Sequence, residues 1–272
     1  MAGELIYRAV RDQRIPTHFD SIDTHCHFGE FTNFFIPENT LESQLRSMDQ
    51  FRIRQAWVSS QVALFADFRG GNDAVAGILK RHPKRFLGMA VVNPNFPESI
   101  RDELNRCSEI HGFRGIKVHC PIHRHSIASS AYDAVWPFAV ERNIPVLVHT
   151  LPGDMAAVRK LSLRYPELRM IIAHANQPEF DQCIEVLKGA PNVYTDITSS
   201  AFPFRFVERL VGSVGSAKIL FGTDMPYLDP ASQWGRLAFA RISDEDKENI
   251  FFRNAEQILK SMETTERTIR DR

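Results

Sequence analysis

Met170-Ile171-Ile172-Ala173-His174 is an apolar run that stops at a histidine, and the chain repeats this arrangement in three other places. A continuously apolar run of this length is typical of a strand that is buried on both faces, as in a parallel sheet. In each place the residue that follows the hydrophobic run can bind a metal ion. The other stretches are Ile22-Asp23-Thr24-His25-Cys26-His27, Val146-Leu147-Val148-His149 and Ile219-Leu220-Phe221-Gly222-Thr223-Asp224.

Eight strand-like runs recur along the chain at intervals of about 20–35 residues, which is the size of a strand, a crossover helix and two loops. This repeat predicts a (β/α)8 (TIM) barrel. A doubly wound open sheet is the alternative, but the candidate ligands end the first, fifth, sixth and eighth strands, which only a closed ring brings together. The runs begin near Ile22, Ala56, Phe86, Gly115, Pro145, Met170, Asn192 and Ile219.

No composition shift or linker divides the chain, so we expect one domain over residues 1–272, with a barrel core at about 20–260 and a frayed polar tail at 261–272. A hydrophobic content of 43% can fill a large core. Lys plus Arg equals Asp plus Glu at 33 each, which argues against nucleic acid and anionic membranes as partners. We therefore expect a small-molecule substrate.

The four cysteines have no paired spacing, and the N-terminus lacks a secretion signal, so a cytoplasmic protein with reduced thiols is expected. Aromatic side chains after the first and seventh strands could line a pocket, but core or subunit-interface roles are the more common ones, which leaves a homo-oligomer open. They are Phe28, Phe31, Phe34, Phe35, Phe202 and Phe204.

Any single histidine of this set could be an ordinary core or loop side chain, and only their joint recurrence favours a metal site. Because strand residues alternate between faces, His25 and His27 project to one side and Cys26 to the other. Imidazole and carboxylate ligands suit zinc, or else Mn²⁺ or Fe²⁺, with one coordination position left for water or substrate. A carboxylate at Asp224 could then accept a proton from metal-activated water.

With these motifs the chain resembles the amidohydrolase superfamily, in the amidohydrolase-related branch that contains metal-dependent hydrolases, lactonases and non-oxidative decarboxylases. The resemblance covers the barrel from Ile22 to about Leu259. It implies that His25, His27, His149 and Asp224 surround the metal. It also implies that His174 binds a second ion or contacts the attacking water or the substrate.

The fourth strand, Gly115-Ile116-Lys117-Val118-His119, leaves the number of ions open. It resembles the family strand whose lysine is carboxylated and bridges two ions in two-metal members. Lys117 could instead bind a substrate carboxylate or pair with an acid, so one ion and two are equally compatible with the sequence. His119 shares a strand face with Lys117 and could bind substrate or support a ligand by a hydrogen bond.

Two further residues are candidates for substrate binding. Arg124, in the loop after the fourth strand, could hold a carboxylate with two parallel donors, although a solvated turn explains it nearly as well. Phe28, in the loop after the first strand, could face a flat substrate.

The principal hypothesis is a metal-dependent hydrolase of a small ester, lactone or amide, in which Asp224 and His174 are catalytic. The alternative is a metal-dependent decarboxylase of a carboxylated aromatic or diene, in which protonation replaces attack by water. A third hypothesis is a metal-bearing binding protein without turnover, against which the retained Asp224 argues.

Overall fold

The computed structural model describes residues 4–12, 14–31, 35–65, 67–177, 179–199 and 203–270. Its centre is an eight-stranded parallel sheet in which each strand pairs with the next one along the chain. The strands are β1 (Ser21–Phe28), β2 (Ile53–Ser60), β3 (Phe86–Val91), β4 (Gly115–His119), β5 (Val146–His149), β6 (Met170–Ile172), β7 (Val193–Asp196) and β8 (Ile219–Leu220).

Backbone hydrogen bonds between β1 and the segment around β8 complete the ring. The amide of Thr24 donates to the carbonyl of Phe221 at 2.9 Å, and the amide of Asp224 donates to the carbonyl of His25 at 2.8 Å. The predicted (β/α)8 barrel is therefore confirmed, and the doubly wound alternative is excluded.

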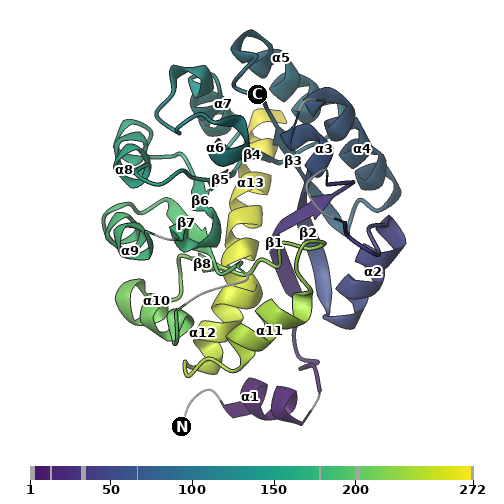
Figure 1. Cartoon of the computed structure of the whole chain (residues 1–272), viewed down its shortest axis with the longest axis vertical. Helices are drawn as coiled ribbons and strands as arrows, with labels where there is room; N and C mark the ends of the chain where they lie inside the picture. Colours follow the sequence, from purple (N-terminus) through teal and green to yellow (C-terminus); the bar gives the residue numbers. More distant parts are fainter. Residues whose placement is uncertain are drawn as a thin grey trace.

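Helices surround the strands as crossover connections (Figure 1). The α-helices are α1 (Glu4–Arg11), α2 (Leu41–Gln50), α3 (Gln61–Leu64), α4 (Phe68–Arg81), α5 (Ile100–Asn105), α6 (Cys120–His123), α7 (Val135–Glu141), α8 (Met155–Arg164), α9 (Phe180–Gly189), α10 (Phe206–Val214), α11 (Pro230–Ala238), α12 (Asp244–Glu248) and α13 (Asn254–Arg270). Shorter helical turns are η1 (Pro97–Ser99), η2 (Arg106–Ile110), η3 (Ser130–Tyr132), η4 (Ala173–Asn176) and η5 (Asn249–Arg253).

The core fills the barrel and the space between strands and helices. Every residue of β3 and β6 is buried, as expected for strands covered on both faces. At the end of the chain, the buried side chain of Asn254 donates to the carbonyls of Ser216 and Ile219 and so fixes the start of α13 beside β8. Helix α13 continues to Arg270 and includes most of the predicted polar tail.

Among the described helices, none is both long enough and apolar enough to cross a bilayer. The four cysteines are all buried and carry no disulfide.

Candidate active site

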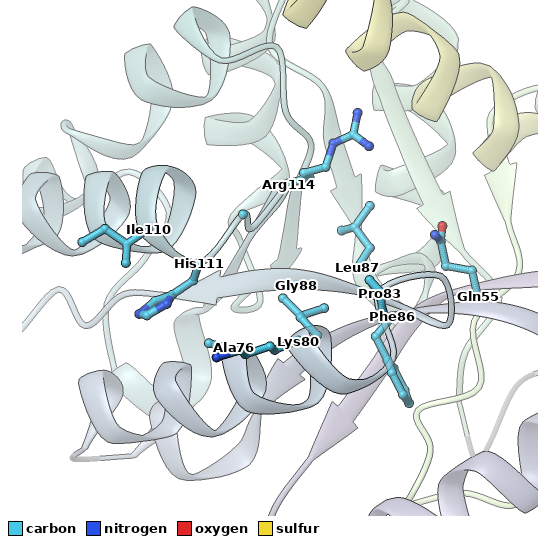
Figure 2. Close-up of a pocket in the computed structure, with 12 residues that line it drawn as sticks. Gln55, Ala76, Lys80, Pro83, Phe86, Leu87, Gly88, Ile110, His111 and Arg114 are labelled. Carbon is cyan, nitrogen blue, oxygen red and sulfur yellow. The ribbon is translucent and has the colours of Figure 1, made fainter.

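Two of the cavities in the described part of the chain lie at opposite ends of the barrel strands. The larger, of about 390 Å³, is at the amino ends of β2, β3 and β4, where Figure 2 shows the side chains of Lys80 and Arg114 pointing apart. The smaller, of about 220 Å³, is at the carboxyl ends of the strands, and we call it the carboxyl-end cavity. It is lined by His25, His27, Phe31, Leu64, His119, Ile122, His149, His174, Asp224 and Tyr227.

Three of the predicted ligands form a tight cluster at the base of the carboxyl-end cavity. One ligand atom from each of His25, His27 and Asp224 lies within 4.8 Å of the others. Asp224 Oδ1 is 3.1 Å from His27 Nε2 and 3.7 Å from His25 Nε2. Two imidazole nitrogens and a carboxylate in this arrangement are a donor set that suits zinc or a neighbouring first-row ion.

The backbone of β1 and of the segment after β8 sets this geometry. The pairing of β1 with β2 shifts register between Asp23 and Cys26, at the point where the histidines begin. Asp224 has a left-handed backbone conformation, with φ of 62°, and its amide is bonded to His25. Gly222 allows the segment after β8 to lie close to β1, because a Cβ at this position would lie only 2.8 Å from the Cβ of His25.

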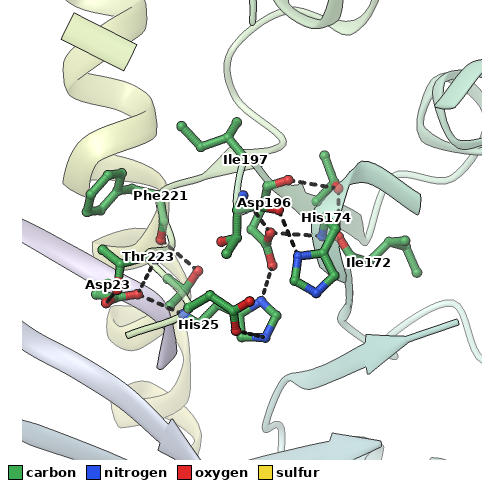
Figure 3. Close-up of polar contacts among 12 residues, drawn as sticks. Asp23, His25, Ile172, His174, Asp196, Ile197, Phe221 and Thr223 are labelled. Atoms are coloured by element: carbon green, nitrogen blue, oxygen red, sulfur yellow. Dashed lines mark hydrogen bonds and ion pairs between the residues drawn. The ribbon is translucent and has the colours of Figure 1, made fainter. Parts of the chain in front are cut away.

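Hydrogen bonds from neighbouring strands orient both β1 imidazoles (Figure 3 shows that of His25). Asp196, at the end of β7, bonds His25 Nδ1 at 2.9 Å, and the hydroxyl of Ser59 on β2 lies 3.0 Å from His27 Nδ1. In both rings Nε2 is therefore the nitrogen directed at Asp224. Carboxylate and hydroxyl partners of this kind fix the ring orientation of metal-binding histidines.

Buried Asp23 ties β1 to the segment after β8. Its Oδ1 accepts from the amides of His25 at 3.0 Å and Thr223 at 3.1 Å (Figure 3). Burial raises the pKa of this carboxyl to about 7, although the hydrogen bonds oppose the shift. Asp23 thus holds the backbone on which His25 and Asp224 are placed.

The carboxylate of Asp224 is strongly favoured in its ionised form. Burial by itself would raise the pKa, but the hydrogen bond with His27 and the nearby rings of His25 and His174 outweigh it and hold the pKa of Asp224 far below its usual value. A carboxylate of this kind is charged and is ready to bind a cation.

His174 follows β6 in a left-handed conformation, with φ of 58°. Its amide donates to Asp196 Oδ1 at 2.9 Å, and its Nδ1 donates to the carbonyl of Thr198 at 2.7 Å (Figure 3). A carbonyl can only accept, so Nδ1 carries a proton, and in the neutral form of the ring Nε2 is the nitrogen with the lone pair. The structure therefore places His174 in the cavity as a potential acceptor.

Lys117 is fully buried, and its Nζ lies 2.8 Å from His25 Nε2. Burial lowers the pKa of this ammonium to about 8. Lys117 is thus in contact with a predicted metal ligand, whereas its carboxylated, bridging form stays a prediction.

His149 and His119 form the opposite wall. The ring of His149 is 4.6 Å from that of His174 and 4.3 Å from that of His119, between ring centroids. Burial holds the pKa of both His149 and His119 well below the usual value for histidine. His149 lines the cavity but is not part of the three-residue cluster, so its role as a ligand stays a prediction.

Arg124 and Phe28 are not brought to this cavity. Arg124 is exposed at the end of α6, and Phe28 is half-buried at the end of β1 outside the lining. Of the loop aromatics, Phe31 lines the cavity, Phe35 and Phe204 are exposed, and Phe34 and Phe202 lie outside the described residues.

Sequence reasoning missed three lining residues, Leu64, Ile122 and Tyr227. For Tyr227 a signal was present, because it follows Asp224 by three residues in the segment after the last strand. Its ring lies 5.3 Å from that of His27 and 4.8 Å from that of Phe31, between centroids.

A protein-family model described as amidohydrolase matches residues 22–260. Among curated proteins, the chain is 24% identical over 248 residues to a gamma-resorcylate decarboxylase of Polaromonas sp. (strain JS666); the match covers 71% of this chain and 76% of that protein.

Solved structures with the same fold include two decarboxylases with bound manganese. A dihydroxybenzoic acid decarboxylase from Polaromonas sp. JS666, with the inhibitor 2-nitroresorcinol, has a TM-score of 0.70 and 20% identity, over 89% of this chain and 97% of that one. A 5-carboxyvanillate decarboxylase from Novosphingobium aromaticivorans has a TM-score of 0.71 and 16% identity, over 89% and 96%. At these identities the likeness establishes the barrel fold.

Proposed function

This chain belongs to the amidohydrolase family of enzymes, and on that premise we propose that it catalyses metal-dependent, non-oxidative decarboxylation of a small hydroxylated benzoate. The observation that carries the proposal is the similarity to gamma-resorcylate decarboxylase over 248 residues. The sequence motifs favoured hydrolysis over decarboxylation. The similarity favours decarboxylation instead, because hydrolysis is supported only by membership of the family.

The carboxyl-end cavity supports a substrate of one aromatic ring. Its volume of about 220 Å³ is below the roughly 300–1,000 Å³ of sites for drug-sized ligands. Phe31, Leu64, Ile122 and Tyr227 supply apolar and aromatic surface, while the histidines and Asp224 supply polar groups at the base. A flat ring that carries a carboxylate and hydroxyl groups matches this division.

His25, His27 and Asp224 would hold the divalent ion, and we propose Mn²⁺ or Zn²⁺. The donor set fits such an ion, and Lys117 would give up its contact with His25 Nε2 when the ion binds. When bound, the ion supplies a Lewis acid that orients and polarises the oxygens of the substrate.

One ion is sufficient for this proposal. A second group of potential ligands consists of His25, His174 and Asp196. However, Asp196 is fully buried and already accepts hydrogen bonds from His25, His174 and Thr198. We therefore assign Asp196 to the support of His25 and not to a second ion.

Asp224 would carry the proton that the reaction needs. From its place in the cavity lining it would accept, as a carboxylate, the proton of the phenol next to the substrate carboxylate, and as an acid it would give that proton to the ring carbon that bears the carboxylate. The bond between that carbon and the carboxylate then breaks, its electron pair restores the aromatic ring, and carbon dioxide leaves. The phenolate product takes one proton from water, so each turnover consumes one proton.

Product analysis in D2O tests the proposal. Purified protein supplied with Mn²⁺ and 2,6-dihydroxybenzoate should release carbon dioxide and resorcinol in equal amounts, with deuterium at the ring carbon that lost the carboxylate. Turnover of esters, lactones or amides with no turnover of hydroxybenzoates would instead support the hydrolase. Tight binding of these compounds without conversion would support a binding protein.

A further inference from the structure

The carboxyl-end cavity has an unusual set of donors for a site that would hold a carboxylate. Within the described residues, its lining contains no arginine and no lysine. Lys117 is not among the lining residues, and its Nζ lies 2.8 Å from His25 Nε2. Among the lining residues, the groups that can donate to a substrate carboxylate are the histidines and the hydroxyl of Tyr227.

His119 is held in one tautomer by the backbone that follows it. It caps the amino end of α6, where its Nδ1 accepts a hydrogen bond from the amide of Ile122 at 3.2 Å. An amide can only donate, so Nδ1 must present its lone pair and the ring proton is on Nε2. Because Nδ1 is engaged with the backbone, Nε2–H is the group left to bind a ligand.

The tautomer of His174 is the opposite one. Its Nδ1 donates to the carbonyl of Thr198, which leaves a lone pair on Nε2. The ring of His149 lies between those of His119 and His174. One side of the cavity therefore offers an N–H donor and the other offers an acceptor, and both assignments come from backbone contacts that a substrate does not alter.

We propose that His119 is the hydrogen-bond donor that binds the carboxylate of the substrate, while His174 accepts from a ring hydroxyl. This assignment deepens the proposed function, because it gives the substrate one orientation. The carboxylate lies toward β4 and α6, and the hydroxyl lies toward β6. It also makes His119 a determinant of specificity for aromatic acids over phenols of the same size.

His119→Asn separates this role from the cap, because asparagine is among the best N-cap residues and its side-chain oxygen can still accept from Ile122. The variant loses the donor at the position of Nε2. Calorimetry with benzoate and with phenol, in the Mn²⁺-loaded protein, provides the measurement. We expect about 10- to 100-fold weaker binding of benzoate, the range for a hydrogen bond to a charged group, and unchanged binding of phenol.

Two variants serve as controls. His125→Asn changes a histidine whose ring contacts Ser129 and Asn95 outside the cavity, and it should bind both probes as the original chain does. His119→Gln, whose amide nitrogen can reach the position of Nε2, should recover part of the benzoate affinity. Equal benzoate affinity in His119→Asn and the original chain would overturn the proposal.

A spectroscopic measurement tests the tautomer without any substitution. Long-range ¹H–¹⁵N correlation of the histidine rings should show His119 protonated at Nε2 and His174 protonated at Nδ1, and the reverse for His119 would overturn the assignment. Benzoate lacks the hydroxyl that the proposed reaction requires, so neither the binding measurement nor the spectra depend on turnover. Failure of the proposed function would appear separately, as absence of turnover of 2,6-dihydroxybenzoate.

Discussion

The two ends of the barrel have cavities that differ in volume and in whether their charged side chains converge. The cavity at the amino ends of β2, β3 and β4, which we call the amino-end cavity, has a volume of about 390 Å³, whereas the carboxyl-end cavity has a volume of about 220 Å³. The charged groups of the amino-end cavity are side chains such as Lys80, which is exposed, and Figure 2 shows that they do not converge. In the carboxyl-end cavity, His25, His27 and Asp224 converge within 4.8 Å, and partners on β2 and β7 fix both rings.

This difference shows that a large cavity does not by itself indicate a chemical site. Holding several ionisable groups together out of water is unfavourable unless each has a partner, so a protein seldom builds such a cluster for packing alone. The carboxyl ends of the strands are also where active sites of this fold lie. We therefore expect substitutions at the two ends to have very different effects on turnover.

Asp224→Asn should have the largest effect. The substitution removes a ligand charge and the group that moves the proton, so we expect kcat to fall by at least about 10³-fold while the fold is retained. Steady-state kinetics with 2,6-dihydroxybenzoate and circular dichroism measure the two outcomes. The matched control is Asp73→Asn, near the amino-end cavity, where a comparable loss of kcat would remove the distinction between the two ends.

Asp196→Asn should weaken the metal site without removing a ligand. Asparagine keeps the shape but not the charge that orients His25 Nδ1, and loss of such a partner commonly costs 10- to 100-fold in metal affinity. Competition with a fluorescent chelator gives the Kd for Mn²⁺. An unchanged Kd would show that Asp196 does not act through the metal site, and the support given to His25 would need another explanation.

The pH dependence of stability distinguishes buried neutral imidazoles from exposed ones. Lowered pKa values mean that the unfolded chain binds more protons than the folded one below pH ~6.5, so the free energy of unfolding rises as pH increases from about 5 to 6.5. Asp23 and Asp196, with raised pKa values, oppose this trend but are fewer. The imidazoles are those of His25, His27, His119, His123 and His149.

Urea unfolding of metal-free protein at pH 5.0, 5.75 and 6.5 gives this slope. Replacement of His149 by Gln should reduce it, because one of the five titrating imidazoles is removed. A flat or falling free energy of unfolding over this range would mean that the carboxyl-end histidines are solvated and chargeable in the folded protein.

Lys80→Ala should have the smallest effect. Lys80 is exposed and lines only the amino-end cavity, so we expect kcat/KM to stay within about two-fold and stability within about 0.5 kcal/mol. Steady-state kinetics and thermal unfolding measure both quantities. A loss of kcat/KM of ten-fold or more would assign a role in turnover to the amino end.

The barrel and the cluster at its base could be predicted from the sequence, because both depend on local patterns. Apolar runs at regular intervals specify parallel strands, and His25, His27 and Asp224 stand where such runs end. In a closed barrel these ends converge whatever the loops do. The prediction therefore did not need the details of any loop.

The remaining features depend on contacts that a linear pattern does not contain. β8 spans only Ile219–Leu220, and the left-handed turn at Asp224 determines where its carboxylate points. Asp196 could be recognised as the partner of His25 only once β7 and β1 were placed. Similarly, Arg124 in the loop after β4 was a candidate for binding a substrate carboxylate, with a solvated turn as the alternative, and the structure has Ile122 in the cavity lining and Arg124 exposed.

Anomalous diffraction at the manganese edge, from crystals grown with Mn²⁺, tests the difference between the two ends most directly. We predict a peak in the carboxyl-end cavity within coordination distance of the Nε2 atoms of His25 and His27 and of a carboxylate oxygen of Asp224. A peak confined to the amino-end cavity, or no peak at these three residues at saturating Mn²⁺, would contradict the assignment of the metal site.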